Sequence, residues 1–246
     1  MKSNYEWEYW GRTDPLWSVA NWKNKQADGS APWTPEEFIR LGELDFADVA
    51  QHWSHYGLLR GRCVEIGCGA GRITRQLVNT FEAVLAVDVS DHQIARAQQL
   101  LGPAAARVEF HVVREPVLPT QDASCDAMFS SHVFQHFPSS RGVRLYLRES
   151  FRVLRPGATI CVHIPVPGAH LTASHSMVWL WLRNAYKKAK RVLRIPRIME
   201  YHRYTVPAVF EILDQSGFKD SEVRIFPMRS NGDYHSFFFA RKGEEQ

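Results

Sequence analysis

The chain has 246 residues with a formal net charge of +4, and 45% of its residues are hydrophobic. A chain of this length can bury a full hydrophobic core without disulfide bonds, and its composition is that of an ordinary soluble globular protein. The first ten residues lack the basic and apolar regions of a signal peptide, and the longest fully apolar stretch, 177–182, is too short to cross a bilayer. We therefore expect a cytoplasmic protein.

The N-terminal segment is unusually aromatic, because six of the eight tryptophans lie within the first 53 residues: Trp7, Trp10, Trp17, Trp22, Trp33 and Trp53. A helix start is indicated at Thr34-Pro35-Glu36-Glu37, where Thr34 can cap, Pro35 suits the first helical position and Glu37 can close a capping box. A second helix is predicted over 46–56. We expect residues 1–60 to form a Trp-rich helical cap, although packing of its own core explains the tryptophans equally well.

From residue 62 onwards short apolar runs alternate with helical patterns, which is typical of a parallel sheet with crossover helices. Strands are predicted at 63–66, 83–87, 108–113, 127–130 and 159–164, and helices at 72–79, 91–101 and 141–154. The last two strands, near 221–226 and 234–240, are separated by a short loop that contains Asn231-Gly232. A link this short predicts an antiparallel hairpin.

The four cysteines, Cys63, Cys68, Cys125 and Cys161, contain no C-x-x-C pair. They are therefore expected to be buried free thiols.

The stretch VEIGCGAGR, residues 64–72, places three glycines directly after a predicted strand. Its spacing is G-x-G-x-G, whereas the dinucleotide fingerprint is G-x-G-x-x-G, and Arg72 stands where the third glycine of that fingerprint would fall. Glu65, just before the loop, would repel a pyrophosphate but would favour a ligand that presents an ammonium group. Asp88, at the end of the next strand, can accept hydrogen bonds from ribose hydroxyls.

Four stretches in this order, VEIGCGAGR, AVDVS, LPTQDASCDAMFSSHVFQHFP and LRESFRVLRPGATICVH, resemble the class I S-adenosylmethionine-dependent methyltransferase family over residues 62–164. The resemblance implies an α/β fold, a Rossmann-like doubly wound sheet of seven strands with the last strand antiparallel, and S-adenosylmethionine as cofactor. The expected cofactor-binding residues are Glu65, Gly67, Cys68, Gly69, Gly71, Asp88, Val89, Glu115 and Ser130.

One departure from the family concerns adenine recognition. Family members usually carry an acidic residue shortly before Leu118-Pro119, where this chain has Arg114, and Glu115 would reach the adenine only with a shift of one residue.

The domain organisation that the sequence predicts is a cap over 1–60, a cofactor-binding core over 61–165, a basic helical insertion above the active site over 166–204, and a C-terminal helix with the hairpin over 205–246.

Two histidines follow the fourth strand, at the edge of the sheet where the transferred methyl group should lie. A hydroxyl is a weak nucleophile at neutral pH, so a nearby base assists its methylation, and histidine, with an ordinary pKa of about 6.5, suits that role. We predict His132 or His136 as this base, with the alternative that His136 only holds the loop through a hydrogen bond. A divalent metal near the acceptor is an alternative, but no tight ligand spacing in the sequence supports it, so no metal site is predicted.

The segment 176–195 has apolar residues at helical spacing and Lys and Arg residues on its other faces. It is expected to cover the active site, to dock on an anionic membrane surface, to contact an acidic partner, or to be a solvated basic face. The expected reaction is O-methylation of a small molecule or glycan hydroxyl, the acceptor being anionic if the basic segment takes part. N-methylation of a small molecule is the closest alternative, and a non-catalytic S-adenosylmethionine-binding protein is another. A nicotinamide-dependent oxidoreductase is disfavoured by the loop spacing, and no nucleic acid partner is expected.

Overall fold

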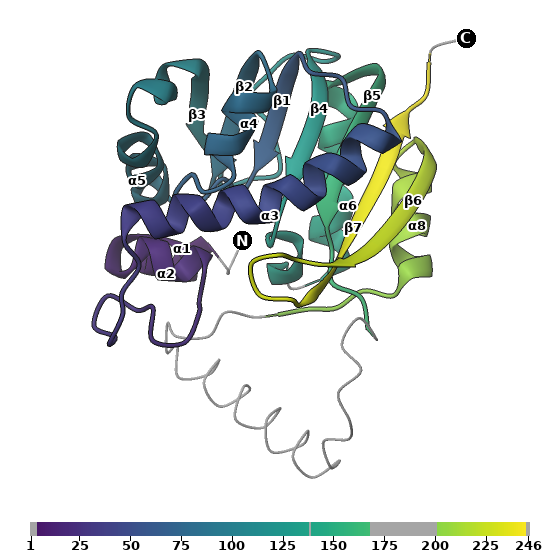
Figure 1. The fold of residues 1–246 in the computed structure, drawn as a ribbon. Helices are drawn as coiled ribbons and strands as arrows, with labels where there is room; N and C mark the ends of the chain where they lie inside the picture. The colour runs from purple at the N-terminus through teal and green to yellow at the C-terminus, as the bar shows by residue number, and fades with distance from the viewer. Residues whose placement is uncertain (1–3, 138, 168–200, 245–246) are drawn as a thin grey trace, which may run out of the picture.

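The computed structural model describes residues 4–137, 139–167 and 201–244, and a seven-stranded sheet forms its centre (Figure 1). The strand order is β3-β2-β1-β4-β5-β7-β6. The strands are β1 (Arg62–Ile66), β2 (Ala83–Asp88), β3 (Val108–Val112), β4 (Cys125–Ser130), β5 (Leu154–His163), β6 (Phe218–Pro227) and β7 (Tyr234–Lys242). Strands β1 to β5 pair in parallel, and β7 runs antiparallel to both β5 and β6. The predicted fold, with its antiparallel last strand, is confirmed.

Helices cover both faces of this sheet. One face carries α3 (Pro35–Tyr56), α4 (Thr74–Thr80) and α5 (Asp91–Leu101), followed by the short 3₁₀ turn η1 (Gly102–Arg107). The other carries α6 (Ser140–Val153) and α8 (Val206–Gln215), while the turn η2 (Phe134–His136) follows β4. Each face buries its own apolar cluster, as expected for a doubly wound sheet whose strands are shielded on both sides.

Helix α3 is one helix of 22 residues, whereas the sequence predicted two separate helices in this region. Its start is as predicted, because Thr34 and Glu37 form the capping box and Pro35 occupies the first turn. The apolar stripe then continues through Phe38, Leu41, Phe46, Val49 and Trp53 without a breaking residue, so the helix continues too.

Strand β5 begins at Leu154, earlier than the predicted residue 159. Its pairing with β4 shifts register between Cys125 and Ala127, opposite Pro156-Gly157, and Gly157 has a positive φ of 79°. Proline and glycine are common just after the end of a helix, but here they form an irregularity within a strand, where such residues are tolerated.

Two short helices from the N-terminal segment, α1 (Asn4–Thr13) and α2 (Pro15–Val19), pack against α5 at the carboxyl edge of the parallel strands (Figure 1). The Gln93 side chain amide donates to Ser18 Oγ at 2.7 Å, and Glu8 pairs with Arg114 just beyond β3 at 3.0 Å. Within residues 1–60, therefore, α3 packs on the sheet, and α1 and α2 lie at its edge.

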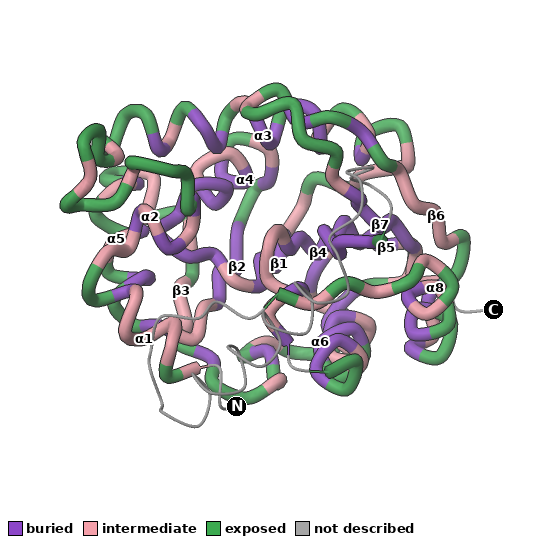
Figure 2. Tube along the Cα trace, turned by 90° about the horizontal axis from the view of Figure 1, so that it is seen from below, coloured by how far each residue is buried: buried purple, intermediate pink, exposed green. Residues whose placement is uncertain are grey.

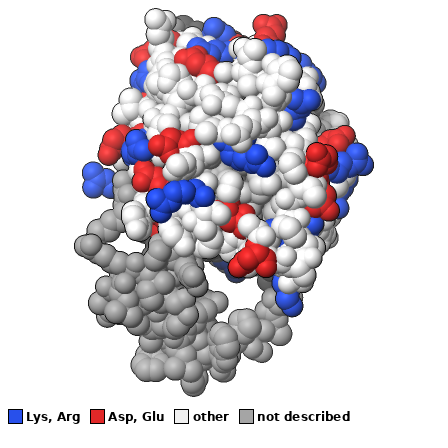
Figure 3. Space-filling view, turned by 90° about the vertical axis from the view of Figure 1, so that its left-hand side faces the viewer, with Lys and Arg blue, Asp and Glu red and all other residues white. Residues whose placement is uncertain are grey.

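On the face of the molecule that carries α5 and β3, positive and negative side chains are interspersed (Figure 3). Ion pairs such as Arg62 with Glu109 and Arg114 with Glu8 account for part of this mixture. The four cysteines are buried and free, as predicted. Among the described residues no helix is long and apolar enough to cross a membrane, and the basic segment 176–195 lies outside the described residues.

Candidate active site

A cavity of about 510 Å³ opens at the carboxyl edge of the sheet. Figure 2 looks onto this edge, with the buried strands at the centre and α1 and α2 beside them. Its walls come from the ends of β1, β2, β4 and β5, from the N-terminal helices, and from the loop between β6 and β7. In open α/β sheets this edge is the usual place for a ligand, because loops and helix starts converge there.

The glycine loop takes its shape from three positive φ angles, 77° at Gly67, 51° at Gly69 and 85° at Gly71. A Cβ atom would come within 2.1 Å of the Val133 side chain at Gly67 and within 2.7 Å of the Val19 side chain at Gly69. Gly67 and Gly69 line the cavity. The backbone is thus approached closely by the chain's own β4 loop and by α2, as well as facing the cavity.

Asp88 lines the cavity beside the glycine loop. Its carboxylate accepts hydrogen bonds from the Gly69 N–H at 2.8 Å and from the Ser90 N–H at 3.0 Å. Burial raises the pKa of Asp88, and these backbone donors oppose that effect. Because each carboxylate oxygen can accept two hydrogen bonds, both remain able to accept from a ribose hydroxyl.

Glu65 lies beneath the glycine loop and is not among the described residues that line the cavity, so its direct contact with an ammonium group stays a prediction that the cavity lining does not support. Side chains alternate along a strand, and Glu65 falls on the α4 side, where Thr74 Oγ1 donates to it at 2.6 Å. Burial raises its pKa to about 7. Its role here is to fasten the start of α4 to β1.

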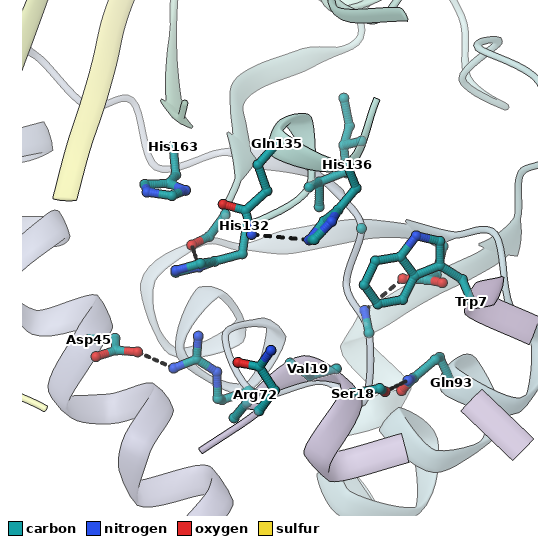
Figure 4. A pocket seen from close by; sticks show the side chains of 18 of the residues that line it. Trp7, Ser18, Val19, Asp45, Arg72, Gln93, His132, Gln135, His136 and His163 are labelled. Atoms are coloured by element: carbon teal, nitrogen blue, oxygen red, sulfur yellow. Dashed lines mark hydrogen bonds and ion pairs between the residues drawn. The ribbon is translucent and has the colours of Figure 1, made fainter. Parts of the chain in front are cut away.

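An ion pair between Arg72 and Asp45 was missed by the sequence analysis as part of the site, although both residues line the cavity. Arg72 follows the glycine loop, and Asp45 comes from α3 (Figure 4). Gly42 lets α3 approach, since a Cβ there would lie 2.3 Å from the Arg72 carbonyl oxygen. Arg72 Nε and Asp45 Oδ1 are buried without a hydrogen-bond partner among the described residues.

His132 and His136 both line the cavity, where the sequence predicted them. His132 has a positive φ of 61°, a strained conformation for a residue other than glycine, and its Nδ1 is 2.8 Å from Ser131 Oγ. The Gln135 side chain amide donates to His136 Nε2 at 3.0 Å, and the Trp7 ring of α1 meets the His136 ring edge-on at 4.7 Å (Figure 4).

Two further histidines lie beside His132. The His163 and His132 rings stack with centroids 4.4 Å apart, and His235 Nδ1 is 3.1 Å from His163 Nε2. Burial first, and the neighbouring histidines second, hold the pKa values of His132 and His163 well below the usual range. Both imidazoles are therefore neutral near pH 7.

The other predicted cofactor residues divide into two groups. Val89 lines the cavity. Cys68, Gly71, Ser130 and Glu115 are absent from the described lining residues, so direct contact is not supported for them. Gly71 packs against Ala97 and Leu101 of α5, and Ser130 Oγ donates to the Ile66 carbonyl at 2.9 Å, which ties β4 to β1.

Neither of the two charged residues considered for adenine recognition lines the cavity. Glu115 is exposed, and Arg114 turns to Glu8. Val89, Val113 and Tyr146 line the cavity instead. An apolar wall of this kind can hold a planar ring by burial of its faces.

Comparison with known proteins identifies the domain. Residues 64–162 match the family model described as a methyltransferase domain. An O-methyltransferase of Penicillium expansum is 30% identical over 102 residues, which make up 40% of this chain and 36% of that protein. The chain thus spans only about a third of the length of this curated relative.

Solved structures share the fold. A phosphoethanolamine N-methyltransferase of Haemonchus contortus, in complex with phosphomonomethylethanolamine and S-adenosylhomocysteine, superposes with a TM-score of 0.60 at 18% identity, covering 86% of this chain and 59% of that one. A methyltransferase of Thermotoga maritima gives 0.61 at 16% identity, covering 96% and 99%. Residues 64–162 therefore match a methyltransferase domain in sequence, and the described chain has the fold of S-adenosylmethionine-dependent methyltransferases, as the motifs predicted.

Proposed function

We propose that this protein transfers the methyl group of S-adenosylmethionine to the hydroxyl oxygen of a small molecule. The observation that carries the proposal is that the glycine loop, Asp88 and His136 open into one cavity. In the transfer, the bond between the methyl carbon and sulfur breaks, a bond between that carbon and the acceptor oxygen forms, and the hydroxyl proton passes to a base. The products are a methyl ether and S-adenosylhomocysteine.

The residues present fit this cofactor. Asp88 keeps acceptor capacity for the ribose hydroxyls, and Gly67 and Gly69 line the cavity beside it. Asp45 and Arg72 offer opposite charges, matching the ammonium and carboxylate of the methionine part, and their unpartnered Oδ1 and Nε atoms can each take up one further hydrogen bond. When bound, the cofactor supplies an electrophilic methyl group on a sulfonium.

His136 is the proposed base for the acceptor hydroxyl. Its Nε2 already accepts a hydrogen bond from Gln135, so an acceptor hydroxyl can replace that amide at the same nitrogen. Trp7 packs against the imidazole and fixes its plane, which aligns the base with the reacting atom. His132, on the other side of Gln135, lies against the acceptor in this proposal.

O-methylation is preferred to N-methylation because a matching curated relative is an O-methyltransferase, and that likeness covers 40% of the chain. A small-molecule acceptor fits a cavity of this volume once the cofactor occupies part of it. The finer predictions of a glycan or anionic acceptor, and of membrane contact through 176–195, depend on residues outside the described part and remain proposals.

The first experiment tests the cofactor. Calorimetric titration of the full chain with S-adenosylmethionine, S-adenosylhomocysteine and NAD should give binding of the two adenosyl sulfur compounds only. Asp88→Ala should abolish measurable binding, because it removes the ribose acceptor and the partner of the Gly69 N–H. Asp214→Ala, on the exposed side of α8, is the matched control and should bind like the parent chain. Tight binding of NAD would overturn the proposal.

The second experiment tests the base. With radiolabelled S-adenosylmethionine and a panel of phenols, alcohols and amines, the accepted substrate class identifies the atom methylated. His136→Gln should lower kcat by about 100-fold to 10,000-fold with unchanged cofactor binding, the range typical for loss of a general base. His55→Gln, exposed on α3, is the control. Binding of the cofactor without turnover on any acceptor would instead favour a non-catalytic binding protein.

A further inference from the structure

Three histidines from different strands and loops meet at one wall of the cavity. His132 follows β4, His163 ends β5 and His235 lies near the start of β7. One nitrogen from each falls within 4.8 Å of the others. Since β5 and β7 are paired neighbours and β4 pairs with β5, the sheet itself brings these three positions together.

We propose that His132, His163 and His235 form a binding site for a divalent transition-metal ion, zinc being the best fit. A zinc ion binds imidazole nitrogens at about 2.0–2.1 Å, so two ligands of a tetrahedral site lie roughly 3.3 Å apart. The nitrogens of His163 and His235 already face each other at 3.1 Å, close to that separation. A ring nitrogen of His132 lies within 4.8 Å of both, and the His132 ring, which is stacked on His163, has to turn to bring that nitrogen to the same separation.

The nitrogens of His163 and His235 already face each other in a hydrogen bond. In the metal-free protein one ring donates its N–H to the other at 3.1 Å, and a metal ion would take the place of that proton. His163 is 3% exposed, and its Nδ1 is buried without a hydrogen-bond partner among the described residues. A buried imidazole with an unpaired nitrogen is costly unless it binds something.

The donor set selects the class of metal. Three imidazole nitrogens suit zinc, copper, nickel or ferrous iron, whereas magnesium and calcium prefer oxygen ligands. Three protein ligands leave the fourth position of a tetrahedral ion open, which is the pattern of catalytic zinc sites. Arg72, the cation nearest to His132 on the cavity floor, is paired with Asp45, so its charge is largely offset (Figure 4).

The open position would face the cavity that also holds the proposed acceptor, and this part of the inference rests on the proposed function. An acceptor hydroxyl bound there loses its proton more readily, because the cation stabilises the resulting oxyanion. His136 takes up that proton, and the oxyanion then forms the bond to the methyl carbon as the bond from carbon to sulfur breaks. The metal site thereby selects acceptors with an oxygen that can coordinate.

The test measures metal binding without any turnover. The full chain, purified without a histidine tag and stripped with a chelator, is titrated with Co²⁺, whose visible absorption reports tetrahedral coordination, and with Zn²⁺ in competition. We expect one equivalent to bind and Zn²⁺ to displace Co²⁺. His163→Gln and His235→Gln should each weaken binding by more than about 100-fold, beyond the loss seen when only an outer partner of a ligand is removed.

The control is His55→Gln, which should bind Co²⁺ like the parent chain. Circular dichroism on every variant excludes unfolding, and His235→Gln, at a less buried position than His163, keeps the test valid if His163→Gln does not fold. Absence of tetrahedral Co²⁺ absorption, or equal binding by the variants, overturns the site. Stoichiometric binding without methyl transfer would leave the site standing and count against the proposed function alone.

Discussion

The Glu65 carboxyl group is buried beneath the glycine loop and accepts a hydrogen bond from Thr74 Oγ1. Burial raises its pKa to about 7, from an ordinary value near 4.5. The folded chain therefore binds a proton that the unfolded chain releases between those two pH values. Glu65 contributes most to the unfolding free energy below pH 4.5, and this contribution is lost as the pH rises through 7.

We predict that Glu65→Gln flattens this pH dependence. In urea unfolding without cofactor, the parent chain should lose on the order of 3 kcal/mol of unfolding free energy between pH 4.5 and 7 through this group. Glutamine keeps an acceptor for Thr74 but does not ionise, so the variant should lose much less. Parallel curves for the two chains across this pH range would contradict the prediction.

Gly69 has a positive φ of 51°, and a Cβ atom added there would lie 2.7 Å from the Val19 side chain. We predict that Gly69→Ala lowers the unfolding free energy by about 1–2 kcal/mol through the left-handed backbone, plus a further loss from the clash. Val19→Ala in the same chain should recover only the clash. A double-mutant cycle separates the two, and strictly additive losses would contradict the contact.

At the scale of elements, helix α3 stabilises the sheet by burying its side chains against one face. Trp53 is fully buried on it, stacks on Phe129, and donates from Nε1 to Thr159 Oγ1 at 2.9 Å. We predict that Trp53→Ala lowers the unfolding free energy by about 3–5 kcal/mol in urea titrations. Trp22→Ala, at a 37% exposed position, should cost far less. A loss of unfolding free energy at Trp53 no larger than that at Trp22 would contradict this role of α3.

The elements with strong local signals were predicted well from the sequence. The cap at Thr34 and the hairpin at Asn231-Gly232 are set by residues a few positions apart, so the pattern alone determines them. The packing of α3 on the sheet could not be predicted in this way, because an amphipathic stripe shows that a face is buried but not against what.

At the scale of the whole molecule, the cavity joins the glycine loop to the N-terminal helices. Ser18, Val19 and Trp22 line it together with Gly67 and Gly69. We predict that saturating S-adenosylhomocysteine slows amide hydrogen exchange in 16–22 as well as in 66–71. At a concentration of 100 times Kd, the stabilisation is about 2.7 kcal/mol, or roughly 100-fold in exchange of amides that open with the site.

The exposed face of α8, far from the cavity, serves as the internal control and should change least, especially in locally fraying amides. Protection confined to the glycine loop would show that the N-terminal helices do not respond to the ligand. Protection of both segments would show that the aromatic N-terminal segment responds to the bound ligand together with the glycine loop.

The site was only half predictable from sequence for a topological reason. Gly67, Gly69 and Asp88 belong to motifs at fixed spacing, and His132 and His136 follow a recognisable strand. The pairing of Asp45 with Arg72, and of His163 with His235, joins residues far apart in the chain that only the folded sheet brings together. Glu65 stands at the motif's spacing before the glycine loop, but its side chain lies on the α4 side of β1, where Thr74 donates to it.

The concentration of indole rings at the N-terminus also gives this chain its own optical probe. Trp7 and Trp22 line the cavity, whereas Trp53 is sealed in the core. A ligand that enters the cavity changes the surroundings of the first two rings and leaves the third unaltered, so intrinsic fluorescence can follow binding on the millisecond scale without any label. Replacing Trp7 and Trp22 one at a time by phenylalanine would then tell from which side each ligand enters.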